Sequence, residues 1–211
     1  MEEQILTKKE RRELRRQERD ETKESYAQKR ILKRYLVRGS ALAVILVLGY
    51  GAYLLSKNTA PQGEDLSRAI SVLEDREHIA VGAEPKVAYN SNPPTSGQHY
   101  DTPARAGFRD KEIADGHLIH SLEHGLVWVS YNPRIGNESA KLKKITAPLT
   151  VITTREANDT DIAVVAWGRL DKFDLEDGTI DEDDIRRIGD FIKRYANKGP
   201  EQIPPGQHGG I

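Results

Sequence analysis

The chain has 211 residues, of which 37% are hydrophobic and 31% charged, and it contains no cysteine. This length suits one ordinary domain with accessory segments. The lack of cysteine excludes disulfides, thiolate nucleophiles and cysteine-based zinc sites. The net charge of −1 conceals an asymmetry. Residues 1–38 hold 13 basic and 8 acidic residues, a net of +5, whereas the rest of the chain holds 19 basic and 25 acidic residues, a net of −6.

The first segment, residues 1–35, is densely charged with both signs and contains neither glycine nor proline. This composition favours a solvated cytoplasmic helix next to the membrane, with ion pairs between successive turns. Apolar residues are too sparse for a coiled-coil seam. Contact with anionic lipid headgroups is the functional alternative. Nucleic-acid binding is not expected, because acidic residues interrupt every basic run.

An uncharged apolar run at residues 39–55 predicts a transmembrane helix at residues 36–55. Its 17 residues span roughly 25 Å as a helix, near the lower limit for crossing a bilayer. The run is apolar on every face, which disfavours a buried core helix, and the long charged leader disfavours a cleaved signal peptide. Basic residues crowd its N-terminal flank, namely Lys29, Arg30, Lys33, Arg34 and Arg38. Because such flanks stay in the cytoplasm, we expect a single-pass cell-membrane protein with a cytoplasmic N-terminus and an extracytoplasmic C-terminal domain.

After a linker at residues 56–64, residues 65–201 are predicted to form an α+β domain, followed by a flexible tail at residues 202–211. The expected architecture is a small antiparallel or mixed sheet with flanking helices. The predicted strands are residues 126–131, 149–154 and 162–170. The predicted helices are residues 65–77, 139–144 and 181–197. Residues 82–107 contain many turn formers and the pair Pro93-Pro94, which indicates a shaped loop that carries function.

Three of the six histidines, His117, His120 and His124, fall within eight residues. On a helix, offsets of 0, 3 and 7 place them on one face. Imidazoles gathered in this way can hold zinc, copper, iron or nickel, and His99 in the shaped loop can supply a fourth ligand. Glu123 is expected to point away from this face and to orient a ligand by hydrogen bonding. His208, in the tail, is expected to play no part in such a site.

Two alternatives to a metal-binding domain stay open. Residues 120–124 match the H-x-x-E-H pattern of inverzincin metalloproteases, in which two histidines bind zinc and the glutamate activates water. This would make Glu123 the catalytic residue of a metallohydrolase, but the pattern is short, so an enzyme is not the favoured interpretation. The other alternative is a structural or interaction module, in which the histidines form a hydrogen-bond network that pins the loop at residues 89–108 to the sheet.

Two segments, YNSNPPTSGQHY at residues 89–100 and HSLEHG at residues 120–125, resemble the prokaryotic family called domain of unknown function 3105. The resemblance extends from about residue 78 to residue 201, including AWGRL at residues 166–170 and KGPE at residues 198–201. It implies a membrane-tethered domain of unassigned biochemical role. The family pattern, carried over by position, includes His78, Pro93, Pro94, Thr95, Ser96, Gly97, His99, His120, Glu123, His124 and Gly125.

The resemblance also shifts the expected metal ligands, because family members are expected to carry an apolar residue in place of His117. The favoured set becomes His78, His99, His120 and His124. His117 and Glu123 are kept as additional candidates. Zinc and copper are the first candidate ions, since imidazole-rich sites without thiolate suit both. We therefore expect a membrane-anchored extracytoplasmic domain that binds a transition metal, with no particular substrate or protein partner indicated.

Overall fold

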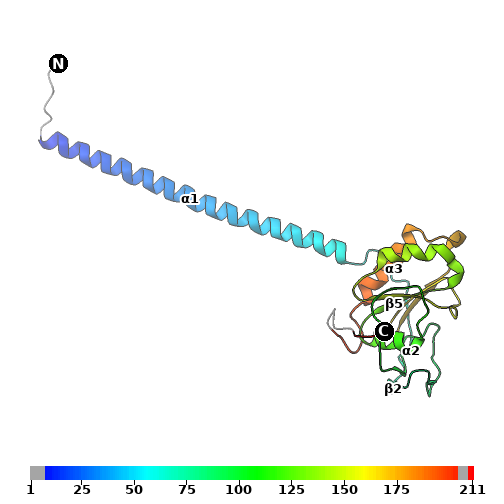
Figure 1. Cartoon of the computed structure of the whole chain (residues 1–211). Helices are drawn as coiled ribbons and strands as arrows, with labels where there is room; N and C mark the ends of the chain where they lie inside the picture. Colours follow the sequence, from blue (N-terminus) through cyan, green and yellow to red (C-terminus); the bar gives the residue numbers. More distant parts are fainter. Residues whose placement is uncertain (1–7, 204–208) are drawn as a thin grey trace. The chain divides into compact units, whose positions relative to one another are not determined.

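The computed structural model describes residues 8–203 and 209–211, and it divides into two compact units, Met1–Asn58 and Thr59–Ile211. Helix α1 (Lys8–Thr59) is uninterrupted and forms the described part of the first unit, ending one residue beyond it (Figure 1). Among the described residues, its segment Leu32–Leu54 is the one stretch long and apolar enough to cross a membrane, and none of it is buried. The helix continues four residues past the predicted end of the membrane segment at residue 55. The beginning of the predicted charged segment, residues 1–7, lies outside the described residues.

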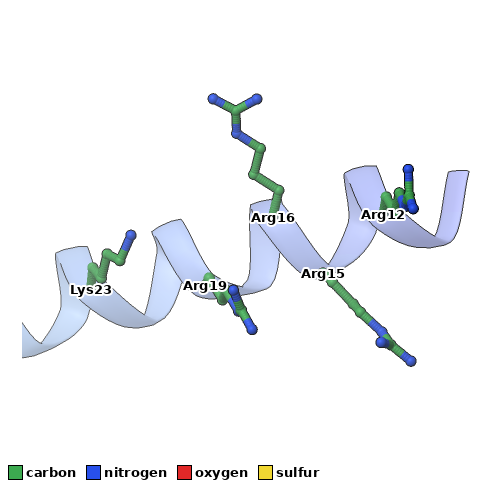
Figure 2. A pocket seen from close by; sticks show the side chains of 5 residues that line it. All are labelled: Arg12, Arg15, Arg16, Arg19 and Lys23. Atoms are coloured by element: carbon green, nitrogen blue, oxygen red, sulfur yellow. The ribbon is translucent and has the colours of Figure 1, made fainter. Parts of the chain in front are cut away.

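Basic side chains gather on the N-terminal part of α1. Figure 2 shows five of them projecting outward from the helix: Arg12, Arg15, Arg16, Arg19 and Lys23. All five are exposed. Arg12, Arg16, Arg19 and Lys23 are spaced by four, three and four residues, which keeps them on one side of the helix, whereas Arg15 points to a different side from Arg16 (Figure 2).

The second unit is built around a six-stranded sheet with the strand order β1-β8-β7-β5-β6-β4. Its strands are β1 (Arg68–Ala69), β4 (Gly107–Arg109), β5 (Val127–Tyr131), β6 (Thr150–Thr154), β7 (Ile162–Ala166) and β8 (Arg169–Phe173). Strand β6 runs parallel to β4 and β5, whereas the other pairs are antiparallel. A separate parallel pair joins β2 (His78–Ile79) to β3 (His99–Tyr100). The mixed sheet with flanking helices confirms the predicted α+β class.

Helices cover both faces of the large sheet (Figure 1). They are α2 (Asp115–Glu123), α3 (Glu182–Tyr195) and the 3₁₀ segments η1 (Pro133–Ile145) and η2 (Glu176–Gly178). Alternate residues of β5 serve the two faces, as the period of two in a strand requires. Val127 and Val129 pack in the cluster that includes α3 and η1, while Trp128 packs with Leu118 and Leu122 of α2. Helix α2 is therefore held directly on the buried sheet.

Helix α3 confirms the prediction of a helix at residues 181–197, because its start is specified locally. The carboxylate of Asp181 accepts hydrogen bonds from the backbone N–H groups of Asp183 and Asp184. The carboxylate of Asp184 in turn accepts from the N–H of Asp181, which completes a capping box. The predicted strands at residues 126–131 and 149–154 correspond to β5 and β6, and the short helix at residues 139–144 lies inside η1.

The predicted helix at residues 65–77 is wrong. Arg68 and Ala69 instead form the edge strand β1, opposite Leu170 and Arg169 of β8. The N–H of Ile70 continues this pairing with a hydrogen bond of 3.0 Å to the carbonyl oxygen of Gly168. Pairing with a strand 100 residues away along the chain thus overrides the helical spacing of a few apolar residues.

The predicted strand at residues 162–170 is two strands, β7 and β8, joined by a tight turn at Trp167 and Gly168. Gly168 has a φ of 65°, in the left-handed region that glycine adopts without steric penalty. A two-residue turn of this kind returns the chain antiparallel to itself. The single strand expected from the apolar run is therefore a hairpin.

Candidate metal centre

Four potential metal ligands come together where β2, β3 and α2 meet. His78 and His99 are register partners in the parallel pair of β2 and β3. Helix α2 supplies His120 and Glu123, which are three residues apart and therefore share a helix face. One ligand atom from each of these four residues lies within 4.8 Å of all the others. We call these four residues the donor cluster.

The three imidazole rings of the donor cluster form a nearly equilateral triangle. The ring centroids of His78 and His99 are 4.9 Å apart, those of His78 and His120 are 4.8 Å apart, and those of His99 and His120 are 4.9 Å apart. His99, His120 and Glu123 expose only 0%, 5% and 3% of their surface. His78 is exposed. The donor cluster therefore lies at the edge of the domain, with His78 as its outermost member.

Backbone carbonyl groups determine which ring nitrogens of the buried histidines carry a proton. Nδ1 of His99 lies 2.8 Å from the carbonyl oxygen of Gly97, and Nδ1 of His120 lies 2.6 Å from that of Tyr100. A carbonyl oxygen can only accept, so both Nδ1 atoms donate. In the neutral ring, Nε2 then keeps its lone pair for the donor cluster. Metal-ligating histidines are commonly oriented by such a bond from the other ring nitrogen.

His99 and Glu123 make a contact that a bound cation explains. Nε2 of His99 lies 3.0 Å from Oε2 of Glu123, yet this buried nitrogen has no partner with hydrogen-bond geometry. A neutral His99 that donates through Nδ1 presents a lone pair to a carboxylate oxygen, and these two repel each other. Either a second proton on His99 or a cation bound between the two atoms removes this repulsion. The donor atoms present therefore fit a metal ion.

The charges around the donor cluster favour the protonation states that bind metals. Burial alone would raise the pKa of Glu123, but a hydrogen bond and positive charge from a protonated His99, together with the guanidinium of Arg76, lower it, and the net shift is downward. Nη1 of Arg76 donates to Oε1 of Glu123 at 3.0 Å, which leaves Oε2 facing the histidines. Burial lowers the pKa of His120 below its ordinary value, and the neighbouring His78 and His99 act in the same direction. Ionised carboxylate and neutral imidazole are the forms that bind a metal.

His124, predicted as a ligand, lies beside the donor cluster at the C-terminal end of α2. Its Nε2 is 3.1 Å from Nε2 of His120 and 3.8 Å from Oε2 of Glu201. It is not one of the four residues whose donor atoms all lie within 4.8 Å of one another. His124 therefore contacts the candidate site through the ring of His120.

His117, an additional candidate, is engaged with the loop that precedes α2. Its Nδ1 lies 2.5 Å from the carbonyl oxygen of Thr102, and its ring packs edge-on against Tyr100 at 4.9 Å between centroids. The donor cluster does not include His117. His208 lies outside the described residues.

Glu123 was expected to point away from the histidines, and that expectation is wrong. Its carboxylate lies within the donor cluster. The spacing of three residues from His120 carries the signal for this placement, because residues i and i+3 share a helix face. Arg76, which binds Glu123, carries no local signal, since it comes from a segment 47 residues earlier.

Hydrogen bonds hold both ends of α2 in place, and therefore also hold the two members of the donor cluster that α2 carries. At the N-terminal end, Asp115 accepts two hydrogen bonds of 2.8 Å from the guanidinium of Arg155, which also donates to the side chain of Asn92 at 2.6 Å. At the C-terminal end, the N–H of Glu201 donates to the carbonyl of Glu123 at 3.0 Å. The helix that carries His120 therefore has little freedom to move relative to the sheet.

A family model described as "Protein of unknown function (DUF3105)" matches residues 80–207. Neither the curated proteins nor the solved structures gave a match. The matched region includes β3, α2 and Glu201, and thus three of the four members of the donor cluster, while His78 lies two residues before it. Because the family model matches more than half of the chain, the protein belongs to the DUF3105 family.

Proposed function

We propose that this protein is a membrane-anchored domain that binds a transition-metal ion outside the cytoplasm. The observation that carries the proposal is the donor cluster, in which the buried Nε2 of His99 lies 3.0 Å from Oε2 of Glu123 and has no hydrogen-bond partner among the described residues. Unpaired buried groups of this kind are costly unless a ligand satisfies them. A cation supplies what the site lacks.

Zinc and Cu(II) are the ions that the donor types favour. Three imidazoles and one carboxylate, with no thiolate, suit both ions. Four protein ligands suit a structural or metal-handling site better than a catalytic one, because catalytic zinc keeps one position for water. The proposed role is therefore that of a metal-binding or metal-stabilised module, with the ion held by His78, His99, His120 and Glu123.

The membrane anchor in this proposal is the apolar segment Leu32–Leu54 of α1. Its N-terminal flank is basic, whereas the unit that follows is acidic overall, and basic flanks are retained in the cytoplasm. We infer that the N-terminus is cytoplasmic and that the unit Thr59–Ile211 is extracytoplasmic. The basic residues nearest the span, such as Arg30 and Arg34, are then placed to meet anionic lipid headgroups.

One observation favours the alternative of a purely structural network. Arg76 already neutralises part of the charge of Glu123, and a second proton on His99 would complete a chain of hydrogen bonds from the loop to α2. This alternative predicts a domain whose stability does not depend on metal. A metallohydrolase is less well supported, because Glu123 lies among the ligands, with Oε1 held by Arg76, rather than free to activate water.

The proposal is tested with the full chain in detergent, purified without a polyhistidine tag and stripped with a chelator. After dialysis against zinc or Cu(II), elemental analysis should find about one ion per chain. His120→Ala and Glu123→Ala should reduce this content strongly. His117→Ala is the matched control, because His117 lies on the same helix outside the donor cluster, and it should retain the ion. Metal content far below one per chain in the wild type, or equal loss in all three variants, would overturn the proposal.

A further inference from the structure

His124 is hydrogen-bonded to His120, one of the proposed ligands, and this contact affects how a metal ion binds at the site. Its Nε2 lies 3.1 Å from Nε2 of His120. Because Nδ1 of His120 donates to the carbonyl of Tyr100, Nε2 of a neutral His120 can only accept. The proton between the two rings therefore belongs to Nε2 of His124.

Nε2 of His120 has one lone pair in the plane of its ring, and this lone pair has two competing uses. It accepts the hydrogen bond from His124, or it binds a metal ion. It cannot do both at once. Binding of an ion at the donor cluster therefore requires His124 to withdraw its N–H from His120.

Glu201 offers the released N–H of His124 a second acceptor. Oε2 of Glu201 lies 3.8 Å from Nε2 of His124, so a movement of about 1 Å gives a charge-assisted hydrogen bond. The backbone of Glu201 is anchored by its N–H, which donates to the carbonyl of Glu123. Its side chain is 59% exposed and can turn toward His124.

We propose that His124 is an exchangeable partner of His120 that regulates ion binding at this site. Without an ion it donates to His120, and when an ion binds it transfers its N–H to Glu201. His124 then opposes ion binding, because its hydrogen bond must be broken, while Glu201 favours ion binding. This inference rests on the proposed function, since it concerns the same site.

The affinity of the full chain for zinc, measured in detergent against a competing chelator, distinguishes these roles. His124→Phe keeps the bulk of the ring and His124→Ala removes it, and both should tighten binding roughly two- to tenfold, the worth of one hydrogen bond. Glu201→Ala should weaken binding by a similar factor. In the His124→Phe background, Glu201→Ala should have no effect. This double variant separates the exchange from a general attraction between Glu201 and the cation.

Nuclear magnetic resonance of ¹⁵N-labelled histidines provides a second readout. His124 should carry its proton on Nε2 both without and with zinc, while Nε2 of His120 changes from hydrogen-bond acceptor to metal ligand. Deprotonation of Nε2 of His124 in the zinc form, with binding in His124→Phe as weak as in His120→Ala, would make His124 a ligand and overturn the inference alone. Unchanged affinity for zinc in His124→Phe would also overturn the inference alone. Failure of the wild type to bind zinc would overturn both the inference and the proposed function.

Discussion

Nε2 of His99 lies 3.0 Å from Oε2 of Glu123, with both residues buried and Nδ1 of His99 already donating to the carbonyl of Gly97. A neutral His99 has no proton to offer this carboxylate. The contact is therefore unfavourable without a cation or an added proton, and favourable around a bound metal ion. The stability of the domain should accordingly depend on metal through this pair of residues.

Replacing the carboxylate of Glu123 by an amide should have opposite effects on the metal-free and the metal-bound states of the site. In Glu123→Gln, the side-chain NH₂ group can donate to Nε2 of His99, so the metal-free variant should melt at or above the temperature of the metal-free wild type. The variant should also lose the rise in melting temperature that zinc gives the wild type, because a neutral amide is a poor metal ligand. The remaining side-chain oxygen can still accept from Nη1 of Arg76, so that hydrogen bond is kept. A zinc-dependent rise that persists in Glu123→Gln would argue against a ligand role for this carboxylate.

The close approach of Gly199 to α2 can be tested with a pair of glycine variants. A Cβ at Gly199 would overlap the carbonyl oxygen of Glu123, so Gly199→Ala should reduce the free energy of unfolding by about 1–3 kcal/mol. Gly189, inside α3, is the matched control, because a Cβ there meets nothing within 4 Å. Gly189→Ala should increase stability by about 0.5–1 kcal/mol, the usual gain within a helix. Urea unfolding measures both, and equal effects would show that the segment after α3 does not clamp α2.

The buried ion pair at the start of α2 should be worth more than an exposed one. Asp115→Ala leaves the guanidinium of Arg155 buried without its carboxylate, which should cost about 3 kcal/mol of unfolding free energy. Asp174, which pairs with Arg134 on the surface, is the control, and Asp174→Ala should cost less than about 1 kcal/mol. Similar losses in the two variants would mean that the pair of Asp115 and Arg155 does not position α2.

Asp190 should make part of the stability of the domain depend on pH. Its carboxylate accepts hydrogen bonds from the backbone N–H groups of Gln62 at 3.0 Å and Gly63 at 2.5 Å. Burial alone would raise the pKa of Asp190, but these donors and Lys193 lower it, and the net shift is downward. A carboxyl group with a lowered pKa in the folded state stabilises the fold above the pKa of the unfolded state, and this contribution is lost as the pH falls through the folded value.

The corresponding measurement compares urea unfolding of the wild type and Asp190→Asn across pH. The variant should be less stable by a constant amount between about pH 5 and pH 7. The difference should shrink below about pH 4, where the carboxyl becomes protonated first in the unfolded chain and then, at its lowered pKa, in the folded one. A difference that does not change down to about pH 2 would show that the charge of Asp190 does not hold residues 62 and 63 to α3.

The parts of the fold that local sequence specifies were predictable. Helix α3 carries its own capping box at Asp181 and Asp184, and the strands β5 and β6 are compact runs of β-branched and aromatic residues. Residues 65–77 could not be assigned in the same way. Their conformation is decided by pairing with β8, about 100 residues away, and single-sequence patterns do not reveal such a partner.

The candidate site likewise has a part that local sequence indicates and a part that depends on distant segments. The spacing of His120, Glu123 and His124 and the resemblance of His99 and its loop to the family pattern point to this region from the sequence alone. The placement of Glu123 among the ligands follows from its three-residue offset from His120 and was predictable in principle. The contacts of Arg76 with Glu123 and of Glu201 with His124 were not, because the fold brings these residues in from segments that are distant in sequence.

Anomalous X-ray scattering from crystals of the zinc-loaded chain decides whether the donor cluster holds a metal ion. We expect one strong anomalous peak about 2.0–2.2 Å from Nε2 of His99, Nε2 of His120 and a carboxylate oxygen of Glu123. Absence of a peak at this position after loading, with Nε2 of His99 still at hydrogen-bond distance from the carboxylate of Glu123, would refute the metal site and identify the cluster as a structural network.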